Sequence, residues 1–501
     1  MSEKMTTANS AEQGKVDIDF AECAVPKWSR RRFLTMFMIM LGFTFFSASM
    51  WVGQEMAAGL DFWGFIKALL LGGAILGIYT GLLGYVGAET GLSLDLLSKR
   101  AFGEKGSYIS SALTSFTQIG WFGVGIAMFA IPVARELFGG STAVEWVLIL
   151  IAGACMTASA YFGIKSLTVI SYIAVPLVAI LGTVAMIMAV KQGDGTIVDQ
   201  FAKSSGSLSV IGGAGLAIGS FVSGGTATPN FTRFAKNGKQ GTIATVVAFF
   251  IGNSLMFFFG AISYIFVGGN DIFEVMIRLN LFYLAILVLG LNIWTTNDNA
   301  LYTAGLGLAN IFNKRKKPMV LISGVIGTLL SVWLYYNFCG WLNILNCTLP
   351  PVGIILVLSY FMNKKAYDTD TVKMVTVNWF AVAGVILGAI VANVVTWGVA
   401  SINGMIVAAL CYVIGEMYKR EKIKNCNYKR NEKTGLLTGF FLYYFRSFAS
   451  SSKFNFFAES TSSVCRNARL QAVKNASISN SILITNAIPA EGIPNCVNKM
   501  V

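Results

Sequence analysis

The chain has no histidine among its 501 residues, and only 12% of its residues are charged. Histidine is the commonest general base, metal ligand and proton shuttle, so its absence removes much of what a membrane-embedded enzyme would use. Soluble domains carry about 25% charged residues, so this chain has too little polar surface for a globule that faces water on all sides. These two shortages predict a non-enzymatic protein that lies largely in lipid.

Cysteine pairs and prolines are also scarce. The eight cysteines include no CxxC pair, so we predict neither a disulfide framework nor a metal site. Proline occurs nine times and glycine 52 times, a balance that suits closely packed membrane helices.

Long apolar runs dominate what is present. Hydrophobic residues make up 55% of the chain, and its mean hydropathy is +0.65. A membrane-crossing helix needs about 20 apolar residues, and the sequence holds about twelve such runs. We therefore predict an all-α polytopic membrane protein of about twelve transmembrane helices, at residues 33–52, 63–88, 107–134, 143–163, 166–190, 208–226, 241–267, 281–312, 318–336, 340–362, 374–395 and 401–418.

The net charge of +14 does not indicate a nucleic-acid partner, because of where the basic residues lie along the chain. Many lie in residues 421–501, and the others gather in alternate loops, the pattern of cytoplasmic loops in membrane proteins. Both termini are therefore predicted to be cytoplasmic. The clusters are Arg30–Arg32, Lys99/Arg100/Lys105, Lys165, Arg233/Lys236/Lys239, Lys314–Lys317, Lys364/Lys365 and Lys419/Arg420.

Two predicted spans are interrupted by small and polar residues, at Gly42–Ser49 and Gly219–Thr226. Non-helical backbone at membrane depth survives where it lines a cavity or is buried in protein. Phe46 and Phe221 are about 175 residues and five spans apart, and a repeat of five spans must insert upside down. Paired broken helices in an inverted repeat indicate a binding site near the midplane. The alternative is that these spans only pack closely.

The densest polar run inside a span is Asn292–Asn299. On a helix, Asn292, Thr295 and Thr296 share one face, and beside the carbonyls of a broken helix their oxygens suit a small hard cation. The alternative is a set of interhelical hydrogen bonds. Asp298, in the same run, is either a proton-linked acid or a structural hydrogen-bond acceptor.

Aromatic and amide side chains elsewhere suit a flat ring compound. Trp121 and Phe221 offer faces on which a heterocycle can stack. Gln118 and Asn297 each combine a donor with an acceptor, which suits an amide-like ring edge. Ordinary core packing is the alternative for either aromatic residue.

Three stretches resemble those of bacterial cytosine permeases in the nucleobase–cation symporter family. They are LGFTFFSASMW at 41–51, QIGWFGVG at 118–125 and LGLNIWTTNDNALY at 289–302, and the resemblance covers about residues 30–420. It implies a LeuT-like five-plus-five inverted repeat with broken helices 1 and 6, and a secondary transporter of the bacterial inner membrane.

The resemblance also implies a site for cytosine, stacked between Trp121 and Phe221. The implied substrate-binding residues are Trp121, Phe221, Gln118, Ser220, Ser223, Asn297 and Phe46. The implied sodium ligands are carbonyls of Gly42, Phe45 and Asn292 and hydroxyls of Thr295 and Thr296. A related ring compound (uracil, a purine, allantoin or hydantoin) and proton coupling stay as alternatives. No other cofactor and no obligate protein partner is implied besides the lipid bilayer.

The predicted organisation has five parts. They are a cytoplasmic N-terminal tail (1–32), the first five-helix repeat (33–190), the inverted second repeat (208–362), two additional transmembrane helices (374–418) and a basic, disordered C-terminal tail (419–501).

Overall fold

The computed structural model describes residues 20, 23–162, 164–269, 272–367 and 374–427. Within these ranges nearly every residue lies in a helix or a short connection, and the one pairing of extended backbone is an isolated parallel bridge between Arg31 and Ala235. The tails predicted at 1–32 and 419–501 lie largely outside the described residues.

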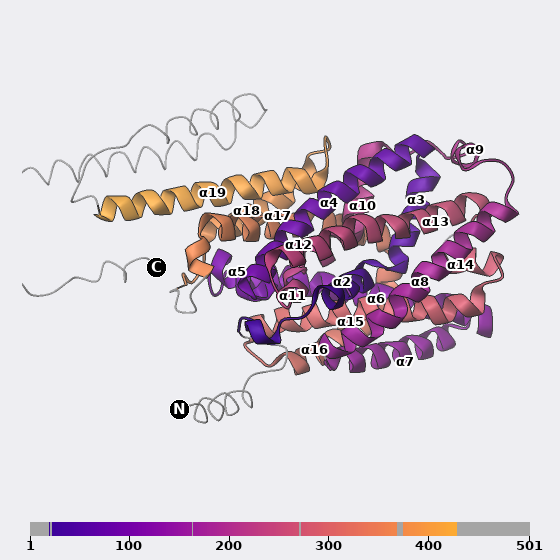
Figure 1. Cartoon of the computed structure of the whole chain (residues 1–501), viewed down its shortest axis with the longest axis horizontal. Coiled ribbons are helices and arrows are strands. Elements are labelled where there is room, and N and C mark those ends of the chain that lie inside the picture. Colours follow the sequence, from indigo (N-terminus) through magenta and orange to yellow (C-terminus); the bar gives the residue numbers. More distant parts are fainter. Residues whose placement is uncertain (1–19, 21–22, 163, 270–271, 368–373, 428–501) are drawn as a thin grey trace, which may run out of the picture. The chain divides into compact units, whose positions relative to one another are not determined.

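The first half of the chain forms long helices joined by short helical turns (Figure 1). In chain order they are η1 (Lys27–Ser29), α2 (Phe33–Thr44), α3 (Ser47–Gly59), α4 (Phe62–Thr90), α5 (Leu94–Phe102), α6 (Ser107–Phe138), α7 (Thr142–Tyr161), α8 (Ile164–Gln192) and α9 (Ile197–Phe201).

The second half repeats this pattern of long helices and short connections. Its elements are α10 (Val210–Thr226), α11 (Pro229–Thr232), α12 (Gly238–Val246), the π-helical turn η2 (Val247–Gly252), α13 (Asn253–Val267), α14 (Ile272–Arg278), α15 (Phe282–Phe312), α16 (Lys316–Tyr336), α17 (Phe338–Met362), η3 (Lys364–Tyr367), α18 (Trp379–Val394) and α19 (Ala400–Asn427).

Every one of the twelve predicted spans coincides with helix. Nine described helices are long and apolar enough to cross a membrane, and the bent pair α2 and α3 makes a tenth. The α15 helix is not among them because the polar run Asn292–Asn299 lies in it, and α18 has only 16 residues. The chain is an integral membrane protein, as predicted.

The first predicted break is confirmed. The α2 and α3 helices meet at an angle of 51°, with Phe45 and Phe46 between them. Phe46 is extended, with φ −131° and ψ 132°, so the helical hydrogen-bond ladder stops here.

The second break lies later than the sequence predicted. The small and polar residues Gly219–Thr226 stay helical, and the interruption falls at Ala227 and Thr228, between α10 and α11. Within α10 the hydroxyls of Ser220 and Thr226 donate to carbonyls of the preceding turn, at 2.8 Å in both cases, so they do not open the helix. Pro229 then begins α11 and cannot donate a backbone hydrogen bond.

Glycine permits a close backbone contact between α3 and α13. A Cβ atom at Gly53 of α3 would lie 2.2 Å from the Phe257 carbonyl oxygen of α13, and one at Gly260 of α13 would lie 1.9 Å from the Met50 carbonyl oxygen. The two backbones therefore touch along this line, as small residues allow in membrane helices.

Several of the basic loops meet at one end of the bundle. Arg30 donates to the Ala88 carbonyl at the end of α4, at 2.6 Å. Arg100 donates to the Ala366 carbonyl and Arg420 to the Met362 carbonyl, both at 2.6 Å. The clusters around these arginines therefore share an end, as the alternating charge pattern requires.

Candidate substrate and cation sites

The break between α2 and α3 is bridged by a side chain from α15. Ser47 is the first residue of α3, and its N–H donates to Asn292 Oδ1 at 2.9 Å. Asn292 Nδ2 in turn donates to the Phe45 carbonyl at the end of α2. One amide therefore supplies hydrogen bonds to a donor and an acceptor that a continuous helix would have paired internally.

The five predicted cation ligands belong to the break and to the segment of α15 that bridges it, and three of their oxygens, on Gly42, Asn292 and Thr295, lie within hydrogen-bond distance of one another through Thr295. Thr295 Oγ1 lies 3.0 Å from the Gly42 carbonyl oxygen and 2.7 Å from the Asn292 carbonyl oxygen. Thr296 Oγ1 lies 3.4 Å from the same Asn292 oxygen. The single Thr295 hydroxyl proton can serve only one of its two carbonyls, and the partially negative C-terminal end of α2 also lies here. Neutral oxygens in such an arrangement can hold a small hard cation.

A small cavity lies beside these oxygens. It is lined by Phe46, Gln118, Trp121, Ser220, Phe221, Gly224, Thr296 and Ala300, and has a volume of about 10 Å³. That is room for about one water molecule. A flat ring compound would therefore have to push the walls apart.

Three aromatic rings, those of Phe46, Trp121 and Phe221, form part of that wall. The centroid of the Phe46 ring lies 5.6 Å from that of Trp121 and 6.4 Å from that of Phe221, edge to face in both pairs. A ring stacked between Trp121 and Phe221 would therefore require Phe46 to move. Because Phe46 belongs to the helix break, a small rotation there would move its side chain.

Two of the seven predicted substrate residues do not line the cavity. Ser223 lies behind Gln118 and accepts a hydrogen bond from its Nε2 at 2.7 Å. Asn297 points toward α6 and α7, where its Nδ2 donates to the Phe122 carbonyl and to Met156 Sδ, both at 3.2 Å. The other five, namely Trp121, Phe221, Gln118, Ser220 and Phe46, share the cavity wall.

Asp298 also lies away from the cavity. It is fully buried, and its Oδ1 accepts a hydrogen bond of 2.5 Å from Ser159 on α7. Trp294 Nε1 donates to the same Ser159 hydroxyl at 2.7 Å. The carboxyl group thus lies in a polar contact between α7 and α15.

Three lining residues were not predicted from the sequence as substrate contacts: Gly224, Thr296 and Ala300. Gly224 follows Ser220 by four residues, and Ala300 follows Thr296 by four, so each lies on a face that already carries a predicted site residue. Helical spacing could have found them, although small apolar side chains carry no chemical signal of their own.

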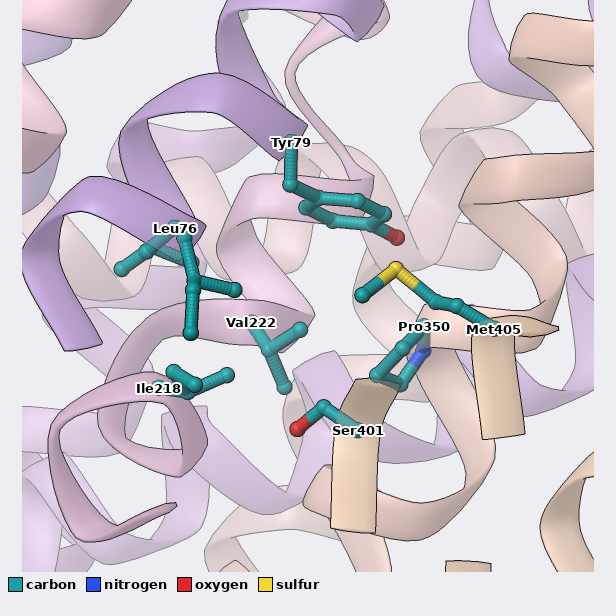
Figure 2. A pocket seen from close by; sticks show the side chains of 8 residues that line it. Leu76, Tyr79, Ile218, Val222, Pro350, Ser401 and Met405 are labelled. Atoms are coloured by element: carbon teal, nitrogen blue, oxygen red, sulfur yellow. The ribbon is translucent and has the colours of Figure 1, made fainter. Parts of the chain in front are cut away.

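A second small cavity lies on the opposite side of α10 (Figure 2). Its wall is apolar apart from two hydroxyls, and it includes Ile218 and Val222 of α10, Pro350 of α17 and Met405 of α19. The Tyr79 hydroxyl, which points toward it, is hydrogen-bonded to Thr226 at 2.7 Å. The other hydroxyl, that of Ser401, donates to Asn346 Oδ1, so both polar groups of this wall already have partners in the protein.

Comparison with known proteins gives a consistent result. Residues 24–452 match the family model described as permease for cytosine/purines, uracil, thiamine, allantoin. The cytosine permease of Escherichia coli strain K12 is 46% identical over 400 residues, which cover 79% of this chain and 94% of the relative. The hydantoin permease of Microbacterium maritypicum is 23% identical over 395 residues, covering 72% and 80%.

Solved structures share the fold at low sequence identity. Mhp1, a nucleobase-cation-symport-1 family transporter in a closed conformation with bromovinylhydantoin bound, superposes with a TM-score of 0.69 at 19% identity, covering 80% of this chain and 95% of Mhp1. A Na⁺-coupled sialic acid symporter gives a TM-score of 0.56 at 14% identity, covering 78% and 90%. These likenesses confirm the predicted LeuT-like class of fold.

Proposed function

Because the chain belongs to the family of permeases for cytosine/purines, uracil, thiamine and allantoin, we propose that it imports cytosine by sodium-coupled alternating access. The observation that carries the proposal is the convergence of neutral oxygens at the α2–α3 break, directly beside a cavity with aromatic walls. A cation and a flat ring could thus bind side by side.

Sodium is the proposed coupling ion, held by carbonyls of Gly42, Phe45 and Asn292 and by hydroxyls of Thr295 and Thr296. These ligands are uncharged oxygens, which suits a monovalent hard cation. Cytosine is neutral, so each co-transported sodium ion carries one charge inward, worth about 2.3 kcal/mol per 100 mV. That energy supports accumulation of about 50-fold before any sodium gradient is added.

Cytosine is the proposed substrate, held between Trp121 and Phe221 after Phe46 moves aside. Stacking on an aromatic face contributes about 1–3 kcal/mol per base. The proposed polar contacts come from Gln118 and Ser220 in the cavity wall, with Ser223 supporting Gln118 from behind. For Asn297 to contact the substrate it would have to leave the Phe122 carbonyl and Met156.

Coupling follows from the order of residues at the break. The carbonyl of Phe45 belongs to the proposed cation site, and the side chain of the next residue, Phe46, belongs to the cavity wall. A cation that fixes the Phe45 carbonyl would therefore restrict where the Phe46 ring can lie. Such a link between two sites is reciprocal, so cytosine would also raise the affinity for sodium.

We further propose that the chain lies in the bacterial cytoplasmic membrane with both termini in the cytoplasm. The support is the alternation of basic and acidic loops along the sequence. Accessibility of single cysteines in those loops to a membrane-impermeant thiol reagent, on a background without native cysteines, would test this orientation.

Uptake of radiolabelled cytosine into proteoliposomes tests the proposed function. Sodium and proton gradients are imposed separately at the same membrane potential. Sodium-driven uptake that persists without a pH gradient is the expected result. Uptake that is driven by a pH gradient without sodium, and that Asp298→Asn abolishes, would show that the coupling ion is a proton. Uptake of hydantoin, allantoin, uracil or a purine in place of cytosine would overturn the proposal that cytosine is the substrate.

A further inference from the structure

A chain of hydrogen bonds behind the cavity runs in one direction. Gln118 Nε2 donates to Ser223 Oγ at 2.7 Å, and Ser223 Oγ donates to Thr117 Oγ1 at 2.9 Å. Thr117 Oγ1 then donates to the backbone carbonyl of Thr114, also at 2.9 Å. A backbone carbonyl can only accept, so the last bond of the chain has a fixed direction.

The fixed end orders the rest of the chain. If Thr117 turned its proton to Ser223, the bond to Thr114 would be lost, and Ser223 would donate to the Gln118 amide oxygen. That reversed arrangement has one hydrogen bond fewer. Thr117, Gln118 and Ser223 are all at most 1% exposed, so water does not replace the lost bond.

The direction of the chain determines which atom of Gln118 faces a ligand. Its nitrogen is held by Ser223, and the side chain lines the cavity. No protein group in the described part of the chain donates to Gln118 Oε1, so that oxygen is available to accept a hydrogen bond from a ring held by the aromatic walls. The amide thus presents an acceptor where a freely rotating amide could present either atom.

We propose that Thr117 is a specificity-determining positioning residue that selects a ring carrying an amino group over one carrying a carbonyl at the same place. This inference rests on the proposed function, because it assumes that a nucleobase occupies the cavity. An exocyclic amine can donate to Gln118 Oε1, whereas a carbonyl there would meet another acceptor. Cytosine and uracil differ in this group, so their relative affinities report the direction of the Gln118 amide.

The test measures how well unlabelled cytosine and uracil displace radiolabelled cytosine from the purified full chain at saturating sodium. Thr117→Val keeps the shape of the side chain but removes the hydroxyl, so Ser223 can donate to Gln118 and the amide can reverse. The expected result is a loss of about ten-fold in the preference for cytosine over uracil. Thr117→Ser keeps the hydroxyl and should keep the preference.

Thr114→Val is the matched control, because it makes the same change one turn away on α6. The Thr114 hydroxyl donates to the Ser110 carbonyl and takes no part in the chain, which uses only the Thr114 backbone. Thr117→Ala serves as a second variant without the hydroxyl if the valine variant does not fold.

The outcomes are distinct. A preference that is unchanged in Thr117→Val or Thr117→Ala overturns the inference, as does an equal loss of affinity for both bases, which would show a purely structural role. A wild-type chain that does not bind cytosine at all would instead overturn the proposed function.

Discussion

Replacing Asn292 by alanine should raise the sodium concentration that uptake requires. The Asn292 amide bridges the two halves of the broken helix, through the Ser47 N–H and the Phe45 carbonyl. Asn292→Ala keeps the backbone carbonyl of residue 292, so the proposed cation loses no direct ligand. What it loses is the support that holds the Phe45 carbonyl in place.

The magnitude follows from the two lost bonds. A buried hydrogen bond contributes about 0.5–1.5 kcal/mol net, so the pair contributes about 1–3 kcal/mol. If that energy serves to hold the break in its cation-binding geometry, the sodium concentration for half-maximal uptake should rise by about 5- to 150-fold. Cytosine affinity at saturating sodium should change much less.

The assay is a sodium titration of radiolabelled cytosine uptake in proteoliposomes, with Asn310→Ala as the matched control. Asn310 lies on the same helix and also makes two side-chain hydrogen bonds, of 3.1 and 2.9 Å, to Ser107 and Ser111. Both variants should unfold at lower temperature than the wild type. Only Asn292→Ala should shift the sodium titration.

An Asn292→Ala protein that folds and keeps the wild-type sodium dependence would refute this reasoning. The amide bridge would then be a packing contact that does not position the proposed cation ligands. A shift of the same size in Asn310→Ala would also refute it, because general loosening of α15 would suffice.

Three further predictions concern the cavity, the cation and a buried acid. Trp121→Ala and Phe221→Ala should each weaken cytosine binding about ten-fold or more in a direct binding assay, because each lost aromatic face removes about 1–3 kcal/mol of stacking energy. A variant that binds with wild-type affinity would show that its residue only packs in the core. Thr295→Val should raise the sodium requirement of uptake because its hydroxyl lies within 3.0 Å of two site carbonyls, whereas Thr303→Val, the same change two turns later on α15, should not. Burial raises the pKa of Asp95, on the short helix α5 outside the membrane spans, to about 6, above its value of 3.8 in an exposed site. Protonation of Asp95 therefore favours the folded state, so its contribution to the free energy of unfolding should be complete below about pH 4 and should fall by about 3 kcal/mol between about pH 4 and pH 6. Asp95→Asn should remove this part of the pH dependence of unfolding in detergent, and an unchanged pH profile in that variant would contradict the assignment.

The sequence misplaced the second helix break, because local helix propensity and hydrogen bonding within the helix favour different outcomes there. The residues Gly219–Thr226 looked like a helix break because glycine and hydroxyl side chains weaken helices in general. In the bundle their hydroxyls bond to carbonyls of their own helix, and the interruption moves to Ala227 and Thr228. The first break was located correctly: α2 ends and α3 begins there, and one amide from α15 bridges them.

The sequence by itself determined the membrane class and the helical spans, and it supplied the residues of the proposed cation site. These follow from apolar length, from the alternation of loop charge and from helical spacing, which are local properties of the chain. The tertiary structure alone decided which faces of α6, α10 and α15 meet. It therefore decided that Asn297 contacts Phe122, that Phe46 lies against both Trp121 and Phe221, and that Thr117 supports Gln118 through Ser223. Such contacts join residues 75 or more positions apart, and they depend on how the helices pack, which no local pattern of residues encodes.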